Sequence, residues 1–150
     1  MSVIVLLDSG PLGMVTNPSA SAGTDECNRW LESLLLEGVE VVVPEIADYE
    51  VRRELLRADK MEGIARLNAL ESAIGYIPIT TQAMLKAAEF WAAARKQGRP
   101  TADDKALDAD VILAAQAALL TLNGDEPVIA TTNVQHLALF VEAREWREIR

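Results

Sequence analysis

The sequence has little cysteine, few aromatic residues and no apolar run long enough to span a membrane. Cys27 is the single cysteine among 150 residues. A single cysteine cannot form an internal disulfide or a paired-cysteine metal site, so we expect a reducing, cytoplasmic setting. The apolar run near the start, Val3–Leu7, is too short for a secretory signal or a membrane-spanning helix.

Basic residues are also in the minority. The chain has 14 Lys and Arg against 23 Asp and Glu, for a net charge of −9, which disfavours nucleic-acid binding by overall attraction. The acids either form an ordinary solubilising surface or converge in part on a bound cation. Half of the residues are hydrophobic, so a single domain over residues 1–150 can bury a core.

Short apolar segments alternate with helical patterns along the chain. We expect strands at residues 3–7, 39–43, 76–79, 128–131 and 146–149. We expect helices at residues 24–36, 45–58, 61–73, 80–96 and 107–122. This alternation predicts a parallel sheet covered by helices on both faces, and Pro78 favours an edge position for the third strand.

Polar residues stand where three of these strands end. Asp8 follows the first strand directly, Glu45 comes just after the second, and Asn133 comes just after the fourth. In parallel sheets, sites form beyond the carboxyl ends of the strands. A carboxylate that ends a buried strand is costly unless something positive meets it. Asp8 therefore predicts a site at this edge.

Two further pairs of acids are candidates for the same site. Glu50 and Glu54 lie four residues apart, so they share one face of their helix, although solvated helix acids are common. Asp108 and Asp110 lead into the apolar segment 111–115 and flank its stripe on opposite sides. Periodicity does not choose between Asp108 and Asp110, and Asp108 could also be a helix N-cap.

The chemistry of these residues predicts a hard cation. Carboxylates without a Cys or His cluster prefer Mg²⁺ or Mn²⁺, and His136, the single histidine, cannot form a multi-histidine zinc site. Such a cation typically supports hydrolysis at phosphorus. Without it, converging acids repel one another and at least one pKa rises.

Four segments resemble the PIN domain in order and spacing. They are LLDSGPLG, VPEIADYEVRREL, LDADVILAAQA and IATTNVQHL, and the match as a whole runs over residues 3–140. The resemblance is greatest to the VapC-like ribonuclease toxins of bacterial toxin–antitoxin pairs. It implies a three-layer α/β/α fold with a central, mostly parallel sheet of four or five strands. It also implies a hydrolase, an endoribonuclease that depends on Mg²⁺ or Mn²⁺.

The resemblance also implies which residues carry the chemistry. Asp8, Glu50 and Asp110 match the metal-binding acids of the family. The fourth acid corresponds to Asn133, which is neutral and leaves a second metal open. Asp108 could compensate as a further metal ligand, or Asn133 could orient a water. The predicted catalytic residues are therefore Asp8, Glu50, Asp110 and Asn133.

The implied partners are an RNA substrate, a second copy of the chain in a homodimer, and a small antitoxin that blocks the acidic pocket with a basic residue. An RNA backbone needs basic residues at the rim of the pocket. The candidates are Arg52, Arg53, Arg95, Lys96, Arg99 and Lys105. Trp30, Trp91 and Trp146 lie in apolar contexts and are expected in the core.

Two other functions compete with the nuclease. Because Asn133 departs from the pattern of the family, the chain could be a catalytically inactive PIN-like module that binds protein or RNA. A phosphoryl-transfer enzyme also places an aspartate at a strand end. The haloacid-dehalogenase type needs a second aspartate where this chain has Gly10, and a receiver domain needs a lysine after a late strand, where none follows VIATTN.

Overall fold

A five-stranded parallel sheet forms the centre of the computed structural model, which describes residues 2–98 and 104–150. The strands are β1 (Val3–Leu7), β2 (Glu40–Pro44), β3 (Tyr76–Ile77), β4 (Glu126–Thr131) and β5 (Ala143–Glu145), in the spatial order β3-β2-β1-β4-β5. Every neighbouring pair is parallel. The expected α/β fold is confirmed, and β3 is an edge strand, as Pro78 predicts.

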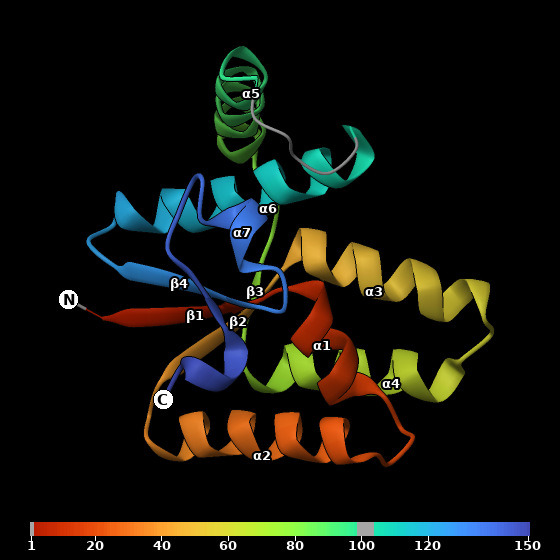
Figure 1. The fold of residues 1–150 in the computed structure, drawn as a ribbon. Helices are drawn as coiled ribbons and strands as arrows, with labels where there is room; N and C mark the ends of the chain where they lie inside the picture. The colour runs from red at the N-terminus through yellow and green to blue at the C-terminus, as the bar shows by residue number, and fades with distance from the viewer. Residues whose placement is uncertain (1, 99–103) are drawn as a thin grey trace.

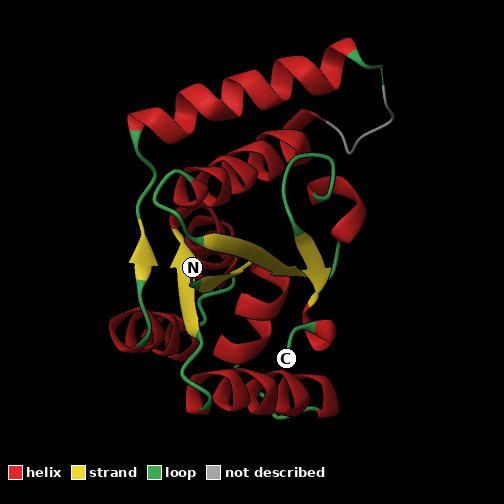
Figure 2. Ribbon diagram, turned by 90° about the vertical axis from the view of Figure 1, so that its left-hand side faces the viewer, coloured by secondary structure: helices red, strands yellow, loops and turns green. Residues whose placement is uncertain are grey.

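Helices cover both faces of the sheet (Figure 1). The helices are α1 (Ser9–Thr16), α2 (Ala22–Leu36), α3 (Glu45–Arg57), α4 (Met61–Ala73), α5 (Thr81–Lys96), α6 (Asp104–Thr121) and α7 (Val134–Leu137). Helices α1, α2 and α4 contribute to the hydrophobic cluster on one face of the sheet, and α6 and α7 contribute to the cluster on the other face. Helix α5 packs on the outer side of α6 (Figure 2). No helix in these described ranges is long and apolar enough to cross a membrane.

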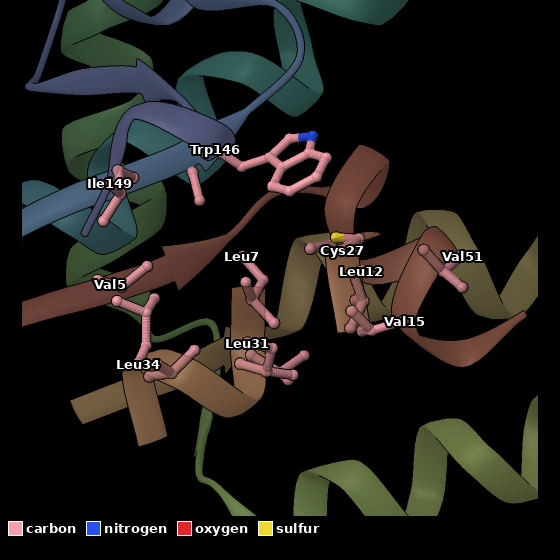
Figure 3. Packing of buried hydrophobic residues seen from close by; sticks show 14 of the residues in the cluster. Val5, Leu7, Leu12, Val15, Cys27, Leu31, Leu34, Val51, Trp146 and Ile149 are labelled. Atoms are coloured by element: carbon pink, nitrogen blue, oxygen red, sulfur yellow. The ribbon is translucent and has the colours of Figure 1, made fainter. Parts of the chain in front are cut away.

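Alternate residues of β1 point to opposite faces of the sheet. Val5 and Leu7 join the cluster that includes Cys27 of α2 (Figure 3), whereas Ile4 and Leu6 join the cluster beneath α6. Because both faces are covered, β1 is a continuous apolar run. Burial raises the pKa of the Cys27 thiol to about 12, so this cysteine is a neutral part of the core.

Several element ends differ from the prediction. Helix α2 begins earlier than expected, because Ser21 caps it and Thr24 closes a capping box with Ser21. Helix α6 begins at Asp104, so Asp108 lies inside the helix and is not its N-cap. The last strand is β5, and the segment predicted as a strand instead forms the 3-10 turn η1 (Trp146–Glu148).

Helices α1 and α7 have no counterpart in the sequence prediction. The sequence of α1 is typical of a loop, because it contains Gly10, Pro11 and Gly13. Pro11 is nevertheless tolerated in the first turn of a helix, where a backbone N–H needs no partner.

The expectation that the tryptophans lie in the core is confirmed for Trp146, which is 1% exposed, and is wrong for Trp91, which is 37% exposed on α5. Helix α5 packs on α6 and, through Phe90, on Phe140, and Trp91 points away from these contacts.

Candidate active site

The ends of β1 and β4 hold Asp8 in place. The backbone N–H of Asp8 donates to the Ala130 carbonyl at 3.0 Å. Its carboxylate accepts hydrogen bonds from the Ser9 N–H at 2.7 Å and from Thr131 Oγ1, also at 2.7 Å. Two parallel strands and the first turn of α1 therefore fix this carboxylate at the carboxyl end of the sheet.

A cavity of about 260 Å³ lies at this end of the sheet. It is lined by Asp8, Ser9, Gly10, Glu50, Asp110, Thr132, Asn133 and His136. The four residues predicted as catalytic are among them, and they come from the residue after β1, from α3, from α6 and from the loop after β4. Asp108 is exposed and does not line this cavity. The structure thus brings together four of the five predicted residues.

Helix packing selects which acids reach the cavity. On α3, Ala47 and Val51 are buried in the core beneath the sheet, and Glu50 faces the cavity beside them. On α6, Leu107 and Val111 pack against α5, and Asp110 faces the carboxyl end of the sheet instead. Tertiary packing therefore decides between Asp108 and Asp110, which periodicity leaves open.

Burial makes the three acids of the cavity harder to ionise, and repulsion from Asp8 adds to this effect for Glu50 and Asp110. Burial, followed by repulsion from Asp8, raises the pKa of Glu50 to about 7 and the pKa of Asp110 to about 6. Burial also raises the pKa of Asp8, although hydrogen bonds from Thr131 and Ser9 oppose the shift. A bound cation would relieve this repulsion.

The donor set fits a hard divalent cation. Asp8, Glu50 and Asp110 offer only carboxylate oxygens, which Mg²⁺ and Mn²⁺ prefer. Among the side chains that the structure describes, no three acidic, histidine or cysteine residues have the arrangement of a formed metal site. The acids would therefore have to draw together around an ion, as repelling carboxylates do when a cation neutralises them.

His136 connects two of the predicted residues at the rim of the cavity. Its Nδ1 lies 3.0 Å from Asn133 Nδ2 and 3.5 Å from Asp110 Oδ2. The short helix α7 begins at the residue after Asn133 and carries His136 to this position. The sequence gives no signal for the contact with Asp110, because the two residues are far apart along the chain.

Gln116 is a second residue that sequence reasoning misses. It is buried in α6, and its Nε2 donates to the Ile77 carbonyl at 2.9 Å. Its Oε1 accepts a hydrogen bond from the Ile46 N–H in the first turn of α3 at 3.4 Å. Gln116 therefore ties the helix that carries Asp110 to the helix that carries Glu50.

The basic residues expected at the rim of the cavity lie in different places. Arg53 lines a groove beside the cavity. Arg52 forms an ion pair with Asp48 instead, with 2.9 Å between Arg52 Nη2 and Asp48 Oδ2. Arg95 lies over the Trp91 ring, and Lys96 is exposed at the end of α5. Arg99 and the side chain of Lys105 fall outside the described part of the chain.

Comparison by sequence gives no match. No protein-family model matches the chain, and no curated protein matches it. Comparison by structure gives clear similarities, which extend over nearly the whole chain.

Three of the similar structures come from different bacteria. VapBC2 from Rickettsia felis, bound to a DNA fragment from its promoter, gives a TM-score of 0.72 at 14% identity, over 94% of this chain and 97% of that one. FitAcB from Neisseria gonorrhoeae gives a TM-score of 0.69 at 20% identity, over 97% of this chain and 99% of that one. VapC20 from Mycobacterium tuberculosis, a sarcin–ricin loop cleaving toxin, gives a TM-score of 0.62 at 15% identity, over 92% of this chain and 97% of that one.

At such low identity these similarities establish the fold. The predicted resemblance to VapC-like toxins is therefore confirmed in the architecture of the chain, which has a PIN-like α/β fold with an all-parallel sheet of five strands.

Proposed function

We propose that this chain is a metal-dependent endoribonuclease and the toxin of a toxin–antitoxin pair. The observation that carries the proposal is the convergence of Asp8, Glu50 and Asp110 on one cavity at the carboxyl end of the sheet. The fold shared with VapC-type toxin structures supports it. The proposal includes the predicted roles of these acids as ligands of Mg²⁺ or Mn²⁺.

The chain's own residues would bind and orient the reacting groups. When bound, a divalent cation lowers the pKa of a water and neutralises phosphate oxygens during hydrolysis. Asp8, Glu50 and Asp110 would hold it, with Asp8 fixed by its hydrogen bonds to Ser9 and Thr131. Asn133, which is neutral, would orient a water or a phosphate oxygen at the cavity rim.

The proposal extends to partners and setting. Similar structures include VapBC and FitAcB complexes, which supports a cognate antitoxin for this chain. A basic side chain of such a partner would find three acids in the cavity and would replace the cation there. We also propose a homodimer, and a cytoplasmic setting that suits the single free cysteine, Cys27.

The test is cleavage of a mixed RNA pool in the presence of Mn²⁺. The wild-type chain should cut RNA with Mn²⁺ and not with EDTA, and Asp8→Asn or Glu50→Gln should reduce cleavage to the level seen with EDTA. The matched control is Glu126→Gln, an exposed glutamate at the opposite end of β4, which should cleave like the wild type. Full activity of Asp8→Asn would refute the mechanism.

Asn133 favours one alternative, a PIN-like module that binds protein or RNA and cleaves nothing. The alternative predicts neither cleavage nor Mn²⁺ binding, because a neutral amide replaces an acid in the ligand set. Titration with Mn²⁺ followed by electron paramagnetic resonance separates the two functions. Binding of Mn²⁺ that Asp8→Asn abolishes would support the nuclease.

A further inference from the structure

A groove of about 500 Å³ runs beside the acidic cavity, between α1 and α3. Ser9 and Glu50 line both the groove and the cavity. The two hollows therefore adjoin each other, and a chain molecule with one residue at the acids could extend into the groove.

The groove has arginine and lysine residues, which the cavity lacks, beside the glutamates Glu50 and Glu54. Arg53, Arg57 and Lys60 line it, in a protein with a net charge of −9. Arg57 is neutralised by Glu54, with 2.8 Å between Arg57 Nη2 and Glu54 Oε2. Arg53 forms no ion pair within the described residues, and its charge lowers the pKa of Glu50, against the larger effect of burial. An unpaired cation thus stands next to the acids, where a polyanion would need one.

An exposed aromatic ring lies beside this cation. Tyr49 directly precedes Glu50 on α3, and its side chain is 55% exposed. The Arg53 guanidinium carbon lies 5.1 Å from the centroid of the Tyr49 ring. Aromatic rings and guanidinium planes are the surfaces on which proteins stack unpaired nucleobases. Tyr49 and Arg53 therefore combine a phosphate-binding charge with a stacking surface.

We propose that the Tyr49–Arg53 pair and the groove beside it bind the single-stranded RNA next to the phosphate that is cut, with Arg53 on a phosphate and Tyr49 on a base. The inference rests on the proposed ribonuclease function and adds the residues that hold the substrate. It also accounts for an exposed tyrosine and an unpaired arginine at the edge of an acidic site.

The experiment measures binding of a labelled, mixed-sequence single-stranded RNA by fluorescence anisotropy over a range of salt concentrations. Asp8→Asn serves as the background in every variant, so that the RNA stays intact. Arg53→Ala should weaken binding and reduce the slope of log affinity against log salt by about 0.7, the value for one phosphate contact on a single strand.

Tyr49 has a different signature in the same experiment. Tyr49→Ala should weaken binding roughly 5- to 150-fold, as loss of one stacked base does, with the salt slope unchanged. Tyr49→Phe keeps the ring and should bind like the background protein.

The matched control for Arg53→Ala is Arg29→Ala. Arg29 is an exposed residue of α2 that lines neither the groove nor the cavity.

Three outcomes would overturn the inference. They are equal affinity and salt slope for Arg53→Ala and Arg29→Ala, equally weak binding by Tyr49→Phe and Tyr49→Ala, and absence of binding by the background protein. Urea unfolding of each variant checks that the fold is intact.

Cleavage by the wild-type chain separates this inference from the proposed function. RNA binding that depends on Arg53 and Tyr49 without metal-dependent cleavage would support the pair as an RNA-binding site and refute the ribonuclease. Cleavage that needs Asp8 but is unchanged by Arg53→Ala and Tyr49→Ala would support the ribonuclease and refute the inference.

Discussion

Thr131 Oγ1 donates a hydrogen bond of 2.7 Å to Asp8 Oδ2 and accepts one of 2.9 Å from the Asn133 N–H. Thr131 is fully buried at the end of β4, so one hydroxyl joins the carboxylate that ends β1 to the loop that carries Asn133. The bond opposes the effect of burial on the pKa of Asp8. Thr131 therefore helps to keep Asp8 ionised and in position.

Replacing Thr131 with valine tests this role. Thr131→Val keeps the shape of the side chain but removes the hydroxyl, and hydrogen bonds to charged groups stabilise proteins by about 1.5–3 kcal/mol. We expect a loss of that size in the free energy of unfolding, measured with urea at neutral pH. In the Asp8→Asn background the same substitution should cost less, because the charge is gone. Equal losses in both backgrounds would show that Thr131 does not act through Asp8.

The sequence predicts most of the fold because the signals are local. Apolar runs such as Val3–Leu7 and the periodic pattern of Met61–Ala73 coincide with β1 and α4. Helix α1 is missed, because glycine and proline in its sequence are typical of loops. Strand β5 is displaced from its predicted position, since the buried Trp146 is held by contacts with a distant helix, among them the Trp30 ring of α2.

The site is predicted in part for a topological reason. The carboxyl ends of parallel strands meet at one edge, so Asp8 and Asn133 are expected to be neighbours, and the structure brings them to one cavity. The contacts of Gln116 and His136 join segments far apart in sequence. No local pattern encodes such contacts, so they emerge only in the folded chain. The ligand roles of the acids stay a prediction.

The two glycines of α1 should respond in opposite ways to substitution with alanine. A Cβ at Gly10 would lie 2.9 Å from Thr132 Oγ1, whereas a Cβ at Gly13 would meet nothing within 4 Å. Overpacking costs about 1–3 kcal/mol, so Gly10→Ala should lower the free energy of unfolding. Gly13→Ala should raise it by about 0.5–1 kcal/mol, the usual gain within a helix.

Urea unfolding of the two glycine variants measures both effects under one set of conditions, and Gly13→Ala serves as the matched control. A gain in stability for both variants would show that the contact between α1 and the end of β4 is loose. Such a result would also mean that Gly10 does not restrict the position of Thr132.

A divalent cation should stabilise the folded chain through the acids of the cavity. Binding to the native state adds about 2.7 kcal/mol at a ligand concentration one hundred times Kd. Without metal and above pH 7, Glu50→Gln should be more stable than the wild type, because it removes a charge that burial and repulsion from Asp8 both disfavour. With saturating Mn²⁺ the order should reverse, since the variant has lost a ligand.

Thermal or urea unfolding with and without Mn²⁺ measures this reversal. Glu126→Gln, which removes an exposed charge far from the cavity, should gain as much stability from Mn²⁺ as the wild type. If Mn²⁺ stabilises the wild type and Glu50→Gln equally, the cation binds elsewhere.

A separate cluster of charges joins α3 to α4 and should make stability depend on pH. Arg52 forms two hydrogen bonds with Asp48 and lies 3.6 Å from Glu71 Oε1. Burial, followed by the hydrogen bond and charge of Asp48, raises the pKa of Glu71 to about 8. Burial also acts on Asp48, but hydrogen bonds from Arg52 and Glu71 outweigh it and lower the pKa of Asp48.

The raised pKa of Glu71 fixes the direction of the effect. Its protonation stabilises the native state fully below the ordinary pKa of 4.5, and this stability is lost as the pH rises through about 8. Glu71→Gln cannot lose a proton, so its free energy of unfolding relative to the wild type should rise between about pH 5 and about pH 9. Urea unfolding at both values measures the difference. Glu62→Gln, an exposed change on the same helix, is the control. If the two variants follow the wild type in parallel across this range, Glu71 is not the group that titrates.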